Sequence, residues 1–239
     1  MRYAAWAATP RGTRVCDVET TTLGALGEVL PLAVGVAFSP LPIIAVILVA
    51  MGERGRAAAV AFAVGRILGL AVVTAIVVLA SDLLYAVAGG GLPTIVTLVL
   101  GAALIVLGVT KWRPKPGGPA PLPGWMRAVQ DASPARAAGF GALVTVANPK
   151  ELALLIAAGT TIGATTLSPG DEALVGLGVV LIASLTTLLP ALAVLIAPTR
   201  VRPALESMRT WLTANHGVVM GILLVVIGAV VFGGAISGS

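Results

Sequence analysis

Six apolar stretches, each about as long as a membrane-spanning helix, constrain this chain more than any other feature. A helix of roughly 20 apolar residues crosses the ~30 Å hydrocarbon core of a bilayer at ~1.5 Å per residue. We therefore expect an all-α polytopic membrane protein with six transmembrane helices, spans 1 to 6. In order, the stretches are Val29–Met51, Ala57–Ala80, Leu92–Thr110, Ala138–Ile162, Ala173–Ala197 and Gly217–Ile236.

The shortage of charge supports the same class. Charged residues make up 10% of the 239 residues, and the mean hydropathy is +1.04. A soluble domain has about a quarter charged residues, so lipid must solvate much of this surface. The chain has one cysteine, one histidine and no GxxxxGK[ST] nucleotide-binding motif. We expect no enzymatic activity, no cofactor, no metal site and no nucleic-acid partner.

Positive charge concentrates in alternate loops. The loops after spans 1, 3 and 5 hold ten Lys and Arg residues, whereas the loops after spans 2 and 4 hold none. The positive-inside rule then places the three positive loops in the cytoplasm, with both termini outside the inner membrane. Residues 111–137 include a Pro/Gly-rich run that predicts a flexible cytoplasmic linker. Residues 1–22 are expected to be a disordered tail, or the result of a wrongly assigned start codon.

Within the apolar spans, a polar residue followed by proline occurs once in each half of the chain, in residues 23–110 and again in residues 138–239. Ser39-Pro40 in span 1 and Asn148-Pro149 in span 4 lie equally far from the start of their spans. Proline lacks an N–H and clashes with the preceding turn, so each span should break near the membrane midplane. An odd number of spans per half reverses the direction of the chain. The sequence thus predicts two inverted three-helix repeats with proline-broken spans 1 and 4.

Polar and charged residues near these breaks form the candidate substrate-binding or ion-binding site. Broken helices expose carbonyl groups, which Ser39 and Asn148 are able to bond, and present N-terminal dipole ends that favour anions. Two plain proline kinks are the simpler interpretation. The candidate residues are Ser39, Pro40, Pro42, Arg66, Asn148, Pro149, Lys150 and Glu151.

Arg66 lies near the middle of span 2, where a charge needs a buried partner. The candidate partners are Glu151 and the carbonyl groups freed by the breaks. Adjacent residues on a helix diverge by about 100°, so Lys150 and Glu151 cannot both face Arg66 squarely. Glu151 is either a proton carrier or one half of a structural ion pair, and the sequence leaves both open. Gly65 and Gly69 form a small-residue face that permits close helix packing or a homodimer.

Two segments resemble the GAP family, the peptidoglycolipid-addressing and sulfolipid-addressing proteins of mycobacteria and related actinobacteria. They are Leu30–Leu48, with its Ser39-Pro40-Leu41-Pro42 element, and Ala61–Leu70. Asn148-Pro149-Lys150 fits the same pattern, and the family looks like a branch of the lysine-exporter superfamily. The resemblance implies export of envelope glycolipids, with membrane lipids or glycolipids as partners and a large lipid exporter alongside.

Other functions stay open from the residues alone. A proton-coupled exporter of a small solute, such as an amino acid or a cation, would use the same breaks with Arg66 and Glu151. A membrane scaffold for a larger complex would need no binding site at all. A lipid substrate predicts a lateral opening with an apolar lining, whereas a solute predicts a closed polar cavity.

Overall fold

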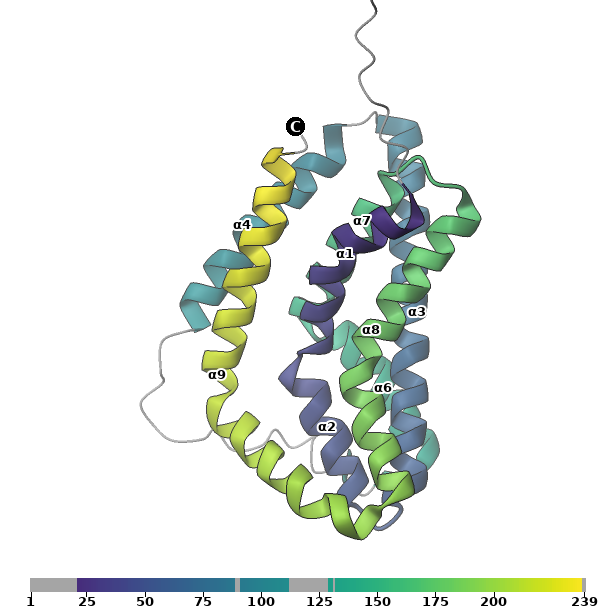
Figure 1. The fold of residues 1–239 in the computed structure, drawn as a ribbon, viewed down its shortest axis with the longest axis vertical. Coiled ribbons are helices and arrows are strands. Elements are labelled where there is room, and N and C mark those ends of the chain that lie inside the picture. Colours follow the sequence, from purple (N-terminus) through teal and green to yellow (C-terminus); the bar gives the residue numbers. More distant parts are fainter. Residues whose placement is uncertain (1–20, 89–90, 112–128, 131, 238–239) are drawn as a thin grey trace, which may run out of the picture.

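The structure is a computed structural model that describes residues 21–88, 91–111, 129–130 and 132–237 of the chain. These residues form α-helices and contain no β-strand. Figure 1 shows an elongated bundle in which most helices follow the long axis. The expected all-α class is therefore confirmed. Most of the predicted tail 1–22 and of the predicted linker 111–137 lies outside the described residues.

The helices vary widely in length. In chain order they are α1 (Thr22–Ala37), α2 (Pro40–Met51), α3 (Gly55–Ala88), α4 (Gly91–Lys111), α6 (Pro134–Ala147), α7 (Pro149–Gly163), α8 (Pro169–Ile196) and α9 (Pro198–Ser237) (Figure 1).

The described residues contain two helices that are by themselves long and apolar enough to cross a membrane, Gly55–Ser81 of α3 and the whole of α8. Three bent pairs meet the same criterion when each pair is taken as one span, which raises the number to as many as five. These pairs are α1 with α2, α6 with α7, and the two parts of α9. In α4, the described apolar helix is the shorter Gly101–Thr110.

Both expected helix breaks are present. The chain bends by 49° between α1 and α2, and by 72° between α6 and α7. Each second helix begins with a proline, and the residue before it is extended: Ser39 has φ −89° and ψ 113°, and Asn148 has φ −97° and ψ 103°. Proline disfavours helical geometry in the preceding residue, which accounts for the similar extended conformation at both breaks, although Pro31 and Pro190 are accommodated inside helices.

The prediction of a loop between spans 5 and 6 is wrong. This segment is helical, because α9 already begins at Pro198, directly after span 5. Proline at the first helical position is favourable, since its N–H would have no partner there anyway. Leu205 and Leu212 are buried and lie seven residues apart on one face of this segment. The helix then bends by 73° between Asn215 and Gly217, where the sixth apolar stretch begins.

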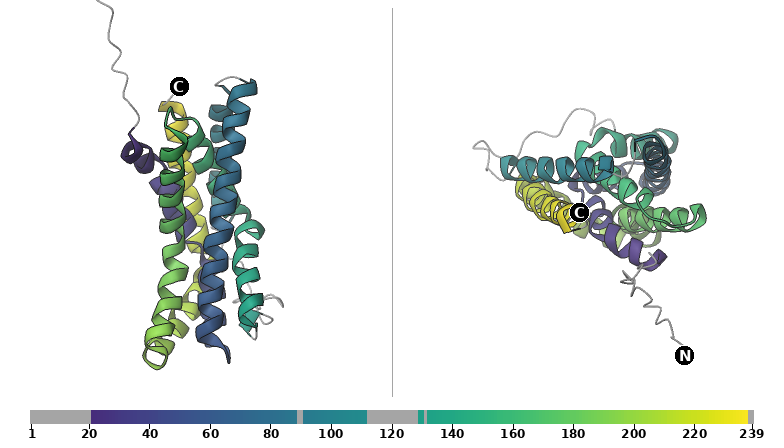
Figure 2. Two further views of the ribbon diagram at one scale, coloured as in Figure 1. Left: turned by 90° about the vertical axis from the view of Figure 1, so that its right-hand side faces the viewer. Right: turned by 90° about the horizontal axis from the view of Figure 1, so that it is seen from above.

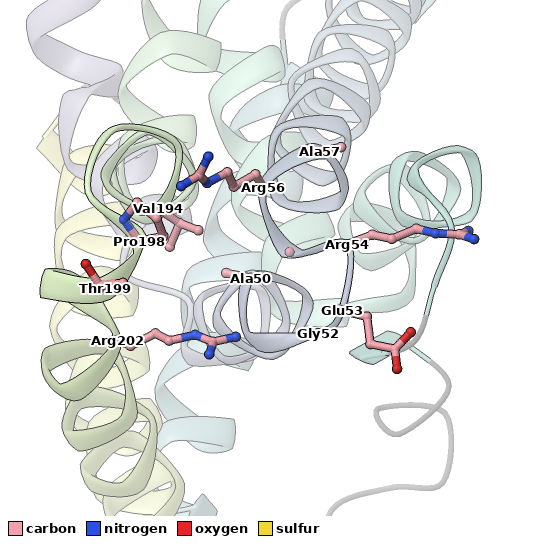
Figure 3. A pocket seen from close by; sticks show the side chains of 11 residues that line it. Ala50, Gly52, Glu53, Arg54, Arg56, Ala57, Val194, Pro198, Thr199 and Arg202 are labelled. Carbon is pink, nitrogen blue, oxygen red and sulfur yellow. The ribbon is translucent and has the colours of Figure 1, made fainter.

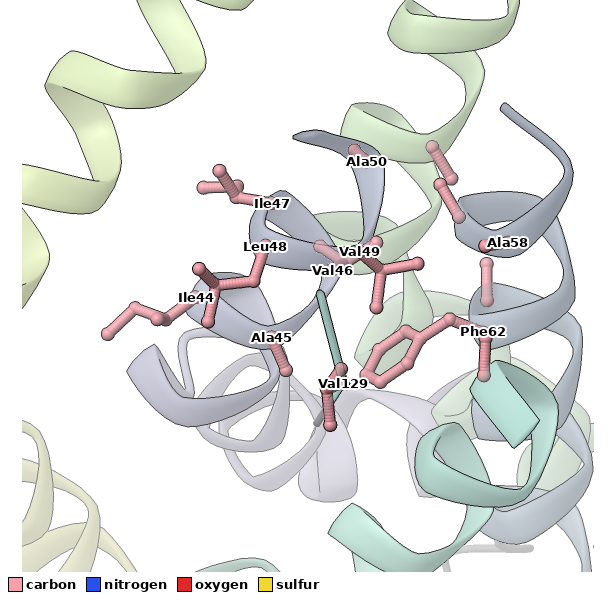
Figure 4. Packing of buried hydrophobic residues seen from close by; sticks show 14 of the residues in the cluster. Ile44, Ala45, Val46, Ile47, Leu48, Val49, Ala50, Ala58, Phe62 and Val129 are labelled. Carbon is pink, nitrogen blue, oxygen red and sulfur yellow. The ribbon is translucent and has the colours of Figure 1, made fainter. Parts of the chain in front are cut away.

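Two apolar cores lie among the residues that the structure describes. The α2 core contains Ile43–Ala50 of α2, together with Phe62 of α3 and Val129, as Figure 4 shows. The second core, here the α1–α7 core, contains residues of α1 and α7 such as Val29, Val36 and Leu154. Each helix break therefore separates a half-helix in one core from a half-helix in the other.

Two long helices run past both cores. α3 and α8 pack against each other along the bundle (Figure 2). On α3, Phe62 belongs to the α2 core and Leu70 to the α1–α7 core, so Arg66 lies between them. On α8, Ala191 belongs to the α2 core and Ala183 to the α1–α7 core. Both long helices thus pass the helix breaks where one core ends and the other begins.

Glycine allows α3 and α6 to approach closely. A Cβ at Gly65 would collide with the carbonyl oxygen of Ala138, and one at Gly69 would lie 2.9 Å from the Cα of Ala142. The small-residue face predicted on span 2 therefore packs within the chain, against α6. This close approach places Arg66 beside the second helix break.

Candidate functional site

The polar residues of the two helix breaks meet in one buried cluster, here the break cluster. It comprises Ser39, Arg66, Asn148, Lys150 and Glu151, each less than one-tenth exposed. Four parts of the chain contribute: the two extended residues at the breaks, the middle of α3 and the first turn of α7. The structure therefore brings together five of the eight candidate residues as interior polar groups.

Asn148 joins the two breaks directly. Its side-chain Nδ2 donates to Ser39 Oγ at 3.0 Å and to Glu151 Oε1 at 3.1 Å. Ser39 and Asn148 thus bond to each other, whereas the sequence led us to expect that they would bond freed carbonyl groups. The amide nitrogen has two hydrogens, and both have acceptors here.

Arg66 forms an ion pair with Glu151. Its Nη1 lies 2.9 Å from Glu151 Oε2, and both side chains are fully buried. The same nitrogen donates to Thr145 Oγ1 at 3.4 Å. Of the partners considered for Arg66, Glu151 is therefore the one found. Sequence reasoning missed Thr145, although its place one turn before Pro149 marks it as a residue next to the break.

Part of the hydrogen-bonding capacity of the break cluster is unused. Lys150 Nζ and Arg66 Nε and Nη2 are buried and have no hydrogen-bond partner among the described residues. Both carboxylate oxygens of Glu151 are already engaged, one by Asn148 and one by Arg66. The cluster therefore combines two cations with one anion and has more donors than acceptors.

Two helix N-termini point into this region. Ser39 precedes α2 and Asn148 precedes α7, and neither side chain caps its own helix. The N-terminus of an α-helix carries the equivalent of about half a positive charge. The break cluster is consequently electropositive from its side chains and from its backbone.

The three prolines of the candidate site shape the backbone. Pro40 and Pro42 are buried in α2, and Pro149 is exposed at the start of α7. None has an N–H to donate. Pro149 therefore acts through the helix break rather than by lining the cluster.

Thr186 of α8 supports the first break, and sequence reasoning did not include it in the site. Its hydroxyl donates to the carbonyl oxygen of Ala37, the last residue of α1. This bond satisfies a carbonyl at the end of α1. Each break thus receives a polar side chain from the long helix of the other half, from Arg66 of α3 or from Thr186 of α8.

A separate pocket of about 470 Å³, here the terminal pocket, lies at the end of the bundle, where α2 meets α3 and α8 meets α9. In Figure 3, Arg56 and Arg202 extend into the space between these two junctions, while Arg54 and Glu53 point away from it. Arg202 Nη2 also donates to the carbonyl oxygen of Met51 at 3.2 Å. The pocket is electropositive, and its arginines come from two of the segments that the sequence predicted to be positive loops, of which Arg56 lies in α3 and Arg202 in α9.

The break cluster lies within a segment that matches a known protein family. A family model described as Sap, sulfolipid-1-addressing protein, matches residues 29–237. Comparisons with curated proteins and with solved structures give no match. The matched segment holds both helix breaks, the break cluster and the terminal pocket, and it covers most of the 239 residues. The chain therefore belongs to the Sap, sulfolipid-1-addressing protein, family.

Proposed function

We propose that this protein exports an envelope glycolipid across the inner membrane, or assists another exporter in doing so. The family and the apolar helices support a membrane-embedded protein involved in lipid export. The observation that carries the finer proposal is the break cluster, a buried polar site where two broken helices meet inside an apolar bundle. In transporters, paired helix breaks near the midplane form the substrate site.

The proposed architecture is six spans in two inverted halves, and the two cores support it. The first broken pair passes from the α1–α7 core into the α2 core. The second passes from the α2 core, through Ala137 and Val144 of α6, into the α1–α7 core. The two broken pairs therefore cross the bundle in opposite directions, as inverted repeats require.

Helix packing supports the same symmetry. If α1–α2, α3 and α4 correspond to α6–α7, α8 and α9, each contact should have a counterpart. α6 packs on α3 as α1 packs on α8, and α7 contacts α4 as α2 contacts α9. The pairs α3–α8 and α4–α9 lie across the symmetry axis and also pack together.

The surroundings of the breaks suit a lipid substrate. Phe38, next to Ser39, is 54% exposed, and Val146, two residues before Asn148, is 46% exposed. Apolar side chains thus face outward at both breaks, where acyl chains would lie beside the bundle while a headgroup reached the cluster. With the positive loops in the cytoplasm, the terminal pocket would be the cytoplasmic entrance.

Deleting the gene and profiling surface lipids tests this function. We expect one glycolipid class to disappear from the surface and to accumulate inside. The wild-type gene should restore it, and a gene carrying Asn148→Ala should restore much less at equal protein level. Arg209→Ala, a change on the cytoplasmic part of α9, is the matched control. Unchanged surface lipids in the deletion strain would rule out the proposal.

A second candidate function is a proton-coupled exporter of a small solute, of the lysine-exporter type. The specific observation in its favour is the fully buried Arg66–Glu151 pair, since buried carboxylates in membrane proteins often carry protons. Proteoliposomes with an imposed pH gradient discriminate between the two functions. Coupled flux of an amino acid or cation, lost in Glu151→Gln, would establish the second function in place of lipid export.

Two partner proposals follow from the first function. A large lipid exporter would co-purify with this protein if the role is that of an accessory. A homodimer is a further expectation, although the glycine face of α3 is occupied by α6 within the chain. Affinity purification from membranes solubilised in mild detergent, followed by mass measurement of the complex, tests both.

A further inference from the structure

We propose that the break cluster binds one anionic group, a sulfate, phosphate or carboxylate, between Lys150 and the free edge of Arg66. The inference rests on the proposed export function and deepens it, because it assigns a negative charge to the headgroup that is moved. The terminal pocket is also basic, but it lies at an end of the bundle where the membrane orientation already explains positive charge. Membrane orientation does not explain the positive charge of the break cluster, which lies in the interior of the bundle.

The unused donors of the cluster carry the argument. A lysine ammonium has three N–H donors, and Arg66 Nε and Nη2 add three more. All six are buried and have no acceptor among the described residues. A single tetrahedral oxyanion offers several acceptor oxygens within a small volume, and a carboxylate offers two.

The acceptors described at this place bond to donors other than Lys150. Glu151 uses one oxygen for Asn148 and the other for Arg66. The hydroxyls of Ser39 and Thr145 each already accept a hydrogen bond. The carbonyl of Ala37, freed at the first break, accepts from Thr186. Lys150 therefore does not act as a structural partner of any of these groups.

An unpaired lysine in this position is costly, which argues for a ligand. Buried donors without acceptors destabilise a fold, and a charge in an apolar membrane interior adds to that cost. Methionine would fill the same volume without either penalty. A cation kept here, beside a pair that is already complete, is the arrangement expected of a binding group.

The backbone points to the same ligand charge. α2 and α7 both begin at the cluster, and neither Ser39 nor Asn148 caps its own helix. Two helix N-termini and a surplus cation converge on one buried place. An anion would be attracted by all three, whereas a cationic solute would be repelled by them.

Binding to purified protein tests the proposal independently of export. The full chain is placed in nanodiscs of neutral phosphatidylcholine, and sulfate is titrated by calorimetry at constant ionic strength. In a second arm, labelled phosphatidylglycerol replaces sulfate, which separates a free anion from a lipid headgroup. We expect saturable binding in at least one arm. Lys150→Met should raise the Kd about tenfold or more, because a charge-assisted hydrogen bond is lost.

Arg200→Met is the matched control, since it removes the same charge at an exposed position on α9. It should leave the Kd unchanged. Equal binding by the wild type and Lys150→Met in both arms, or no saturable binding in either, would overturn the proposal.

Thermal stability distinguishes a binding role of Lys150 from a structural role, because the two roles predict opposite changes in the Tm of Lys150→Met. Without ligand, Lys150→Met should have a higher Tm than the wild type, because it removes an unpaired buried cation. A lower Tm would mean that Lys150 has a structural partner, and this would also overturn the proposal. Anion binding with unchanged surface lipids in the deletion strain would refute lipid export and leave the anion site standing. Altered surface lipids in the deletion strain, without anion binding by the purified protein, would refute the anion site and leave lipid export standing.

Discussion

The side-chain amide of Asn148 donates to the hydroxyl oxygen of Ser39 at 3.0 Å, across 109 residues of sequence. This bond joins the two helix breaks, because each residue is the extended position just before a helix-starting proline. Asn148 also holds Glu151, so the contact between the breaks and the buried ion pair belong to one network.

The first prediction concerns this bond. Asn148→Ala should destabilise the protein more than Ser39→Ala, because only Asn148 also serves Glu151. The coupling between the two changes should be about 1 kcal/mol, as for other hydrogen bonds between membrane helices. A double-mutant cycle on the free energy of unfolding in detergent measures it. Strictly additive effects would show that the two residues do not interact.

The second prediction concerns the buried ion pair. Glu151→Leu should lower the free energy of unfolding by about 3–5 kcal/mol, because it leaves Arg66 as an uncompensated buried charge. Arg66→Met should cost less, since Lys150 is adjacent to Glu151 and is available to pair with it. Unfolding by denaturant in micelles measures both.

The partly exposed pair Arg209–Glu206 on α9 is the control for this comparison. Arg209→Met should cost about 1 kcal/mol or less, as for other exposed ion pairs. Equal losses at the two sites would contradict the assignment of Arg66 and Glu151 to a buried network.

Much of the break cluster follows from the sequence. Proline fixes its own φ and disfavours helical geometry in the residue before it, and the matched pairs Ser39-Pro40 and Asn148-Pro149 located both breaks. Proline alone would not have located them, because Pro31 and Pro190 lie inside helices. Charge in an apolar stretch requires a partner, which reduced the choices for Arg66 to a few groups. These inferences are local or depend on one strong energetic rule.

The remaining features depend on how distant helices are placed. Thr145 and Thr186 are ordinary threonines in the sequence, and only the packing of α3 on α6 and α8 on α1 gives them partners. The direct bond between Ser39 and Asn148 likewise requires that the two breaks adjoin. The helix at the start of α9 was missed because its composition is polar and lacks a long apolar run, although Leu205 and Leu212 face the interior.

The third prediction concerns the close approach of α3 and α6. A Cβ at Gly141 would collide with the carbonyl oxygen of Phe62 and lie 2.9 Å from the backbone nitrogen of Arg66. Gly141→Ala should therefore push the helices apart, lower the free energy of unfolding by about 1–3 kcal/mol and weaken the Arg66–Glu151 pair. Thermal unfolding of the purified protein measures the loss.

Gly139 is the matched control, two residues away on the same helix. A Cβ there meets nothing within 4 Å. Gly139→Ala should be neutral or stabilising by up to about 1 kcal/mol, because alanine favours the helix. A similar loss for both variants would mean that helix packing does not limit this position.

The fourth prediction concerns orientation in the membrane. Thr166, between α7 and α8, and Thr199, in the first turn of α9, are both exposed and lie near opposite ends of α8. The positive-inside rule places Thr199 in the cytoplasm, because Arg200 and Arg202 follow it closely, and places Thr166 outside. With the single native cysteine removed by Cys16→Ser, a membrane-impermeant maleimide should label Thr166→Cys in intact spheroplasts. Thr199→Cys should react only after permeabilisation. The opposite labelling pattern would mean that the protein has the reverse orientation in the membrane. The terminal pocket with Arg56 and Arg202 would then face outward, where it would release a headgroup rather than receive one.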